Sequence, residues 1–438
     1  MPSAQQSIKF RTTITKLKFL VRDQKIEKWL ALGKLTTFTG FAQVAIQAIG
    51  FISGILVIRI LPTEEYALYT LANTMLGTMI ILADGGISSG VMSEGGKVWK
   101  NRHRLGEVIE TGIYLRKRFA IFSLVIATPI LFYLLHHHGA SWLSASLILL
   151  ALIPAFFTAL SGSILEIVPK LHQDITGLQK IQVLSNLGRL GLLGLTIFVF
   201  PWAYVAILAA GLPQIWANFQ IRKRSRIFSE ETTRINQESK KQILALVKRL
   251  MPGAVYYAFS GQITIWLISI FGSTMGVAQI GGLGRLTMTL SVFFSLFGTL
   301  VVPRFARLSS KESTIGFFLL SQLGLIILAI ILVLLVKLFS TQLLWLLGNE
   351  YSDLSRELLL IFIAAGINLI SGCTHVLLSS RGIVLPPVLY IIGIITFQII
   401  LLLMLDISSV LGVITFNIFS TLFLYVLRLG HFFLEKKI

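Results

Sequence analysis

Three ionisable side chains lie inside long apolar stretches of the sequence. Asp84, Arg189 and Arg285 each fall well within such a stretch. A charge at the centre of a lipid bilayer costs at least ~2.5–3.5 kcal/mol, so these residues usually face a bundle interior or a water-filled cavity. Arg189 and Arg285 are suited to hold phosphate oxygens, because a guanidinium presents a planar fork of donors. A carboxylate such as Asp84 must be protonated, ion-paired or bound to a cation.

Uncharged polar side chains recur in the same stretches at the spacing of one helix face. Side-chain amides on such a face can hydrogen-bond the hydroxyl groups of a ligand, or they can join neighbouring helices. His375 is a candidate for gating or proton transfer, with a packed core histidine as the alternative. The candidates for ligand binding are Gln43, Gln47, Asn73, Gln182 and Asn186.

The elements that position these residues are membrane-spanning helices. The chain has 438 residues, of which 55% are hydrophobic and 13% charged, whereas soluble domains carry about 25% charged residues. Apolar runs of about 20 residues can cross a bilayer only as helices, because backbone groups in lipid must be satisfied within the segment. The runs are continuous and lack the two-residue alternation of a membrane barrel. We predict an all-α fold with about twelve spans at residues 35–60, 66–92, 115–135, 142–168, 178–200, 202–221, 250–271, 277–302, 314–339, 357–379, 383–404 and 408–428.

The positive charge of the chain, +19 at pH 7, follows the predicted loops. Lys and Arg gather in alternate loops, as the positive-inside rule requires, so the sequence predicts that both termini lie in the cytoplasm. In a soluble protein this charge would suggest nucleic acid; here the distribution accounts for it, and we expect no nucleic-acid partner.

The predicted spans fall into two halves of six. Residues 62 and 273 lie in matching short turns, and the basic segments 97–104 and 304–311 also match, at an offset of roughly 210 residues that suggests two parallel repeats. We therefore expect a basic N-terminal arm, two six-helix lobes around a central cavity, a basic linker between the lobes and a cytoplasmic tail. Their predicted ranges are 1–34 (arm), 35–221 (first lobe), 222–249 (linker), 250–428 (second lobe) and 429–438 (tail).

The loops and motifs argue against an enzyme. No predicted outer loop exceeds about 20 residues, which is too short for a folded catalytic domain. The sequence contains no Walker loop, no dinucleotide-binding glycine motif after a strand and no HExxH motif. The single cysteine, Cys373, lies in an apolar run and provides neither a disulfide nor a cysteine metal site. We expect a transporter without a bound cofactor or metal; whether H+ or Na+ is its coupling ion is left open.

Two segments resemble bacterial polysaccharide and O-antigen flippases. Arg59–Ala72, RILPTEEYALYTLA, resembles the segment that joins the first two spans of that family, with Ala67 where Gly is usual. Ala83–Gly90, ADGGISSG, resembles the end of the family's second span. The resemblance implies the multidrug/oligosaccharidyl-lipid/polysaccharide exporter superfamily and two six-helix lobes. It also implies a bacterial cytoplasmic (inner) membrane protein of surface polysaccharide and lipopolysaccharide biosynthesis, which flips a polyprenyl-pyrophosphate-linked oligosaccharide to the periplasmic leaflet.

The resemblance suggests a role for each candidate residue. Arg189 and Arg285 would hold the pyrophosphate or acidic sugars, and the five amides would bind sugar hydroxyls. Asp84 would serve as a coupling or gating carboxylate, with an ion pair to an arginine as the alternative. Expected partners are the lipid-linked oligosaccharide, membrane lipids, a polysaccharide polymerase and glycosyltransferases.

Four other functions remain open. A multidrug cation antiporter of the same superfamily would favour carboxylates within the membrane, and a peptidoglycan lipid-precursor flippase would usually have more spans. A membrane glycosyltransferase or polymerase would place an acidic pair in an outer loop, which this sequence lacks. A non-transporting scaffold subunit would not need charges buried in both lobes.

Overall fold

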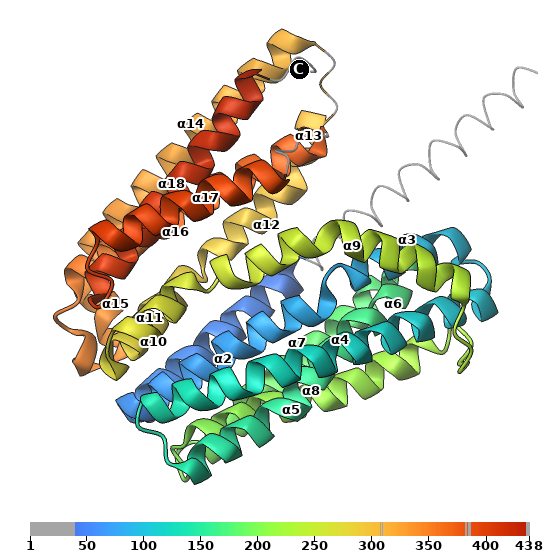
Figure 1. The fold of residues 1–438 in the computed structure, drawn as a ribbon, viewed down its shortest axis with the longest axis horizontal. Helices are drawn as coiled ribbons and strands as arrows, with labels where there is room; N and C mark the ends of the chain where they lie inside the picture. Colours follow the sequence, from blue (N-terminus) through green and yellow to red (C-terminus); the bar gives the residue numbers. More distant parts are fainter. Residues whose placement is uncertain (1–39, 307, 309, 382, 384–386, 435–438) are drawn as a thin grey trace, which may run out of the picture.

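The computed structural model describes residues 40–306, 308, 310–381, 383 and 387–434. Within these ranges every regular element is a helix, and the helices form two bundles (Figure 1). The predicted N-terminal arm and the last four residues of the predicted tail lie outside the described residues. The structure confirms the predicted all-α class.

The N-terminal bundle holds the helices up to residue 225. Its turns use ordinary capping chemistry: the side chains of Asn101 and Ser141 accept hydrogen bonds from the backbone N–H groups of Arg104 and Ser144. Gly85 and Gly86 have φ angles of 48° and 98°, which glycine adopts easily, and they separate the second helix from the third. The helices are Gly40–Ile60, α2 (Thr63–Asp84), α3 (Ile87–Val98), α4 (Arg102–His137), α5 (Trp142–Leu165), α6 (Ile167–Leu171), α7 (Ile175–Thr196) and α8 (Ala203–Ser225).

The C-terminal bundle contains two bent helix pairs, α9 with α10 at 51° and α11 with α12 at 43°. A short 3-10 turn, Asn349–Tyr351, precedes α16. The helices are α9 (Gln237–Ser260), α10 (Ile263–Phe271), α11 (Thr274–Thr287), α12 (Leu290–Leu300), α13 (Val302–Ala306), α14 (Lys311–Leu338), α15 (Ser340–Leu347), α16 (Ser355–Ser380), α17 (Pro387–Met404) and α18 (Val410–Leu434).

The described helices account for all twelve predicted spans. Seven helices are long and apolar enough to cross a membrane, and each of the two bent pairs adds one more. The other three predicted spans correspond to α7, α8 and α17. Helices α7 and α8 have 22 and 23 residues but carry more polar side chains, and the apolar part of α17 is the shorter segment Tyr390–Met404.

Helix α9 connects the two bundles. It begins at Gln237, within the basic range 222–249, and the side chain of Asn236 caps it by accepting from the N–H of Ser239. Ile243 and Val247 are four residues apart and therefore share one face, which is buried against the N-terminal bundle. Figure 1 shows α9 lying along that bundle before the chain enters the C-terminal one.

Three apolar cores show how the bundles meet. The largest core contains residues of both bundles, among them Met75 of α2, Leu283 of α11 and Leu358 of α16. A second core lies in the N-terminal bundle and includes the start of α9, and a third lies in the C-terminal bundle around Phe318 and Phe432. The bundles are thus joined at one end and have separate cores at the other, which gives the V shape in Figure 1. The basic segments around residues 97–104 and 222–234 lie at the separated end of the N-terminal bundle.

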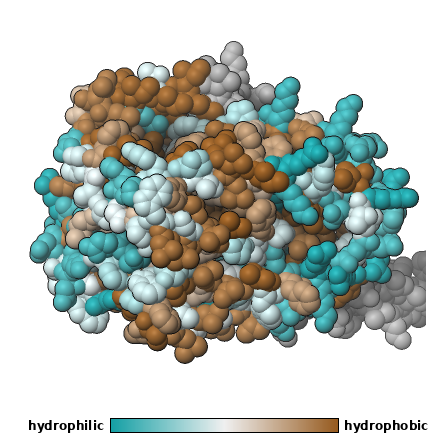
Figure 2. Space-filling model, turned by 60° about the horizontal axis from the view of Figure 1, so that its bottom comes forward, coloured by the Kyte–Doolittle hydropathy of each residue, from teal (hydrophilic) through white to brown (hydrophobic). Residues whose placement is uncertain are grey.

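The outside of the bundles is apolar, as lipid contact requires. Large apolar side chains such as Phe122, Val125, Leu320 and Leu334 are more than half exposed. Figure 2 shows hydrophobic side chains over the middle of one face, with hydrophilic ones gathered toward its two ends. In water such a surface would be an aggregation hazard, whereas in a bilayer it is the expected boundary.

Candidate functional site

Tyr69 of α2 is where the two candidate arginines meet. The guanidinium carbon of Arg285, from α11, lies 5.9 Å from the centre of the Tyr69 ring. Arg189, from α7, lies against the hydroxyl of the same tyrosine, and Asn73 is its neighbour one turn along α2. One cation therefore comes from each bundle, and both reach the same phenol.

Arg285 is held by close helix packing. A Cβ atom on Gly54 of the first helix would lie 3.3 Å from Cδ of Arg285, so the alkyl part of this side chain rests directly on that glycine. Gly281 approaches Thr70 so closely that a Cβ there would lie 2.6 Å from its hydroxyl oxygen. Small residues thus let α11 lie against α2 and carry Arg285 to Tyr69.

Neither arginine is neutralised by a carboxylate. Across the described parts of the chain, the ion pairs involve other side chains, and the buried Nε of Arg189 has no hydrogen-bond partner. Two half-buried cations that share one tyrosine produce a positive potential in a setting of low dielectric. This arrangement favours an anionic ligand.

The structure brings only some of the five candidate amides to this point. Asn73 donates to the carbonyl of Tyr69 at 2.8 Å and stays beside the arginines. Asn186 donates to the carbonyl of Gln182 at 2.8 Å, and Gln182 itself donates to Glu166 at 2.9 Å, away from Tyr69. Gln43 is exposed and Gln47 half-buried, three and two turns before Gly54 on the first helix.

Asp84 is ion-paired. Its carboxylate accepts from Arg116 of α4, a side chain only 4% exposed, and from the backbone N–H of Ser88 at 3.1 Å. The sequence places Arg116 at the start of the third predicted span, but α4 begins at Arg102, so this arginine lies about four turns inside the helix. The ion-pair alternative is therefore what the structure shows for Asp84.

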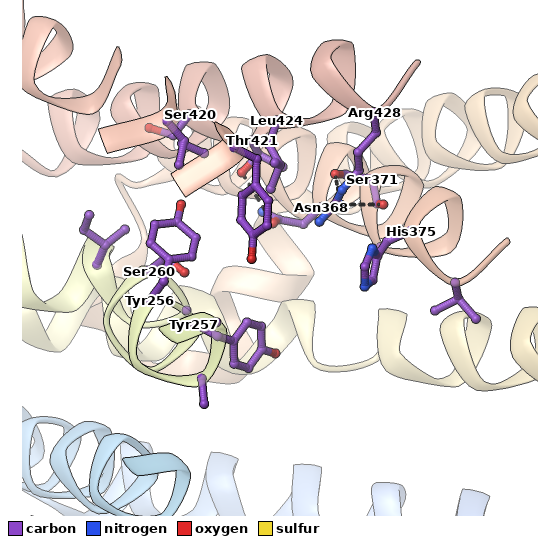
Figure 3. A pocket seen from close by; sticks show the side chains of 18 of the residues that line it. Tyr256, Tyr257, Ser260, Asn368, Ser371, His375, Ser420, Thr421, Leu424 and Arg428 are labelled. Atoms are coloured by element: carbon purple, nitrogen blue, oxygen red, sulfur yellow. Dashed lines mark hydrogen bonds between the residues drawn. The ribbon is translucent and has the colours of Figure 1, made fainter. Parts of the chain in front are cut away.

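A cavity of about 900 Å³ is lined mainly by α9, α16, α17 and α18 of the C-terminal bundle and also by Ile81 of α2; Tyr69 is not part of its lining (Figure 3). His375 lines the cavity, and its side chain is exposed. Arg428 also lines it and donates to the carbonyl and hydroxyl oxygens of Ser371 at 2.8 and 2.7 Å. Sequence reasoning missed Arg428 as a site residue, although Asn417, Thr421 and Arg428 follow the spacing of one helix face.

The joined end of the bundles is held by polar contacts between them. Arg59 of the first helix donates to the carbonyl of Leu346 at 2.9 Å, and its guanidinium lies 5.0 Å from the ring centre of Trp345. On the other side of this end, Nε2 of His138 lies 2.9 Å from the carbonyl oxygen of Ser269 and Nδ1 lies 3.0 Å from the hydroxyl of Thr274. Burial lowers the pKa of His138 below its ordinary value of 6.5.

Solved structures resemble the whole chain. No family model matches it, and the search of curated proteins finds no match. An inward-facing multidrug resistance MATE family transporter of the MOP superfamily aligns with a TM-score of 0.67 at 15% identity, over 89% of this chain and 97% of that one. The lipid II flippase MurJ, in an inward closed conformation, aligns with a TM-score of 0.65 at 12% identity, over 90% and 86%.

A third solved structure is described by the polarity of its binding pocket. It is a MOP superfamily transporter from Pyrococcus furiosus, whose reverse polarity of the binding pocket is said to suggest a different function. It aligns with a TM-score of 0.55 at 13% identity, over 90% of this chain and 94% of that one, so the match extends over both bundles.

At 12–15% identity these likenesses establish the fold alone. The chain therefore shares the fold of these solved transporters, and its own helices form two bundles. This confirms the expected arrangement of two lobes, while the substrate is a separate question.

Proposed function

We propose that this protein is a transporter rather than an enzyme, and that it flips a polyprenyl-pyrophosphate-linked oligosaccharide across the cytoplasmic membrane for surface polysaccharide biosynthesis. The observation that carries the proposal is the meeting of Arg189 and Arg285, one from each bundle, at Tyr69. Neither arginine has a carboxylate partner among the described residues. A pyrophosphate suits this site, because each guanidinium can bind phosphate oxygens through two parallel hydrogen bonds.

The charge of the site argues against a multidrug cation antiporter. A cationic drug needs carboxylates within the membrane, whereas Asp84 is already neutralised by Arg116. The Pyrococcus furiosus transporter is a relevant comparison, since reverse polarity of its pocket is said to suggest a different function. We infer from the two arginines at Tyr69 that the present chain carries an anion.

A peptidoglycan lipid-precursor flippase is the second candidate. The likeness to MurJ, with a TM-score of 0.65, favours it, and a lipid-linked pyrophosphate would fit the same pair of arginines. The sequence resemblance of the segments Arg59–Ala72 and Ala83–Gly90 favours the polysaccharide precursor. Both candidates share the anionic headgroup and differ in the saccharide.

The arrangement of the bundles supports transport by alternating access. The bundles share one core at the joined end and have separate cores at the basic end, so the site at Tyr69 lies between two bodies that can rock. With basic segments on the cytoplasmic side, this state would face inward, with both termini in the cytoplasm. An anion that contacts Arg189 and Arg285 would contact both bundles and could couple its binding to their movement.

The test is surface polysaccharide display in a bacterium from which the gene has been deleted. Arg189→Ala and Arg285→Ala should each reduce display sharply at normal protein level, and the lipid-linked precursor should accumulate. Lys at either position should restore display only in part, because an ammonium cannot replace the planar fork. Arg234→Ala is a matched control, since Arg234 is exposed in the segment between the bundles. Full display by the double Ala variant would refute the proposal.

A further inference from the structure

The cavity of the C-terminal bundle is large enough to bind part of a cargo. Its volume of about 900 Å³ lies in the range of small-molecule sites, roughly 300–1,000 Å³. Asn417 and Arg428 both line it from α18, eleven residues apart, so the polar lining extends about 16 Å along that helix at 1.5 Å per residue. The cavity is therefore elongated along the helices.

One end of this lining is cationic. Arg428 is fixed by two hydrogen bonds from its Nη1 to Ser371, and Figure 3 shows it beside His375. Arg249 and His431 also line the cavity. The described residues around the cavity include no Asp or Glu, so Arg428 has no carboxylate beside it within this lining.

The deeper part carries amides and hydroxyls that already form a network. Asn368 donates to Asn417 at 3.2 Å, Thr421 donates to Asn368 at 3.4 Å, and Asn417 donates to Thr264 at 3.0 Å. The hydroxyl of Ser420 is buried, lines the same cavity and has no hydrogen-bond partner in the described structure. Groups that both donate and accept, set side by side, match the hydroxyls of a saccharide.

Tyrosine rings form the wall opposite α16 and α18. Tyr256 and Tyr257 come from α9, and Tyr390 comes from α17. Tyr256 and Tyr390 meet edge to face with ring centres 6.0 Å apart, and the Tyr256 hydroxyl lies beside Ser260 and Gln398. An aromatic face offers apolar contact to the C–H face of a sugar ring, while the phenol hydroxyl offers a hydrogen bond.

We propose that this cavity binds the saccharide part of the cargo and that Arg428 receives an anionic group on it, a carboxylate or a phosphate. The inference rests on the proposed function and adds a substrate class to it, an acidic oligosaccharide. The pyrophosphate is assigned to Arg189 and Arg285, and the acidic sugar to Arg428, at separate places. Because the lining contains no carboxylate, an anion fits here better than an organic cation.

Calorimetric titration of the purified full-length protein in detergent tests the assignment. The probes are trigalacturonate as an acidic saccharide, maltotriose as a neutral one and inorganic pyrophosphate. Wild type should bind trigalacturonate more tightly than maltotriose. Arg428→Gln should raise the Kd for trigalacturonate about tenfold or more, since it removes a hydrogen bond from a charged donor. The Kd for pyrophosphate should change less than twofold.

Two further variants separate binding from folding. Ser420→Leu fills the cavity while keeping Arg428, and it should also weaken trigalacturonate binding. Arg381→Gln is the matched control, because Arg381 is likewise an arginine of this bundle that donates to a backbone carbonyl, that of Leu308, but it lies outside the cavity lining. The binding of a variant is compared with that of wild type only if the two have the same melting temperature. If Arg428→Gln does not fold, Arg428→Lys takes its place.

Three results would overturn the inference. They are an absence of trigalacturonate binding to wild type, equal binding of maltotriose, and loss of pyrophosphate rather than saccharide binding in Arg428→Gln. The proposed function fails in a different way. If wild type does not restore polysaccharide display while trigalacturonate binding still depends on Arg428, the cavity assignment stands and the transport assignment does not.

Discussion

The guanidinium of Arg116 in α4 donates to the carboxylate of Asp84 at the end of α2. The same guanidinium donates to the hydroxyl of Ser88 at 2.9 Å, and the N–H of Ser88 donates back to Asp84. These contacts fasten the end of α2, the start of α3 and the middle of α4 to one another. They support a structural role for Asp84.

Removal of this carboxylate should therefore destabilise the protein. Asp84→Asn leaves Arg116 buried without its charge partner. For a fully buried pair this change lowers the free energy of unfolding by about 3–5 kcal/mol; the effect is smaller here, because Asp84 is 27% exposed. The melting temperature in detergent should fall, and Asp84→Asn with Arg116→Met should recover part of it. Unchanged stability together with altered ion dependence of transport would instead return Asp84 to a coupling role.

His138 should make the contact at the joined end sensitive to pH. Its pKa is lowered from 6.5, mainly by burial and also by neighbouring His137, so the closed contact disfavours the imidazolium. The contact is then at full strength above about pH 6.5 and weakens as the pH falls below that value, because a hydrated imidazole in the opened state takes up the proton more readily. Acidification should favour separation of the bundles at this end.

Spin labels measure that separation. Cysteines in place of Ser141 and Ser352, both exposed, would carry them in a Cys373→Ala background. As the pH falls from about 8 to about 5, the population with a long distance between the two labels should rise. His138→Gln should abolish this change. An unaltered pH response in His138→Gln would show that another group is responsible.

Arg59 should contribute to closure at the same end without a pH dependence. Arg59→Ala removes the hydrogen bond to Leu346 and the contact with the Trp345 ring. Since Arg59 is exposed, the expected gain in the open population is modest, and Arg59→Lys should retain part of the closure. The same spin labels report the change; a wild-type distance distribution in Arg59→Ala would assign closure to other contacts.

Membrane orientation can be tested by cysteine labelling. Single cysteines at Gly139 and Ser352 should react with an impermeant reagent applied outside, and one at Arg226 should react only after the membrane is opened. Lys436, also expected inside, lies outside the described residues. The background is Cys373→Ala, whose native thiol is buried. External labelling at Arg226 would reverse the proposed direction of transport.

The predictions from sequence succeeded for helices and were incomplete for contacts. The apolar runs located twelve helices or helix pairs, because hydropathy is a property of a continuous segment. They could not show that α4 continues to Arg102 and α9 to Gln237, because a charged extension of a helix has the composition of a loop. Arg116 was consequently interpreted as a basic residue at the start of a span. Arg428 was interpreted as the last residue of the final span, whereas α18 continues to Leu434; both side chains are held within the bundles.

The sequence by itself determined that the chain is a set of membrane helices and that arginines lie within them, because lipid selects side chains one segment at a time. Only the tertiary structure decided which of those arginines are free to bind a ligand. Arg116 meets Asp84, whereas Arg189 and Arg285 meet at Tyr69. The difference arises because the partner of each side chain lies on another helix, and the packing of small residues such as Gly54 and Gly281 sets which helices approach closely enough to supply it.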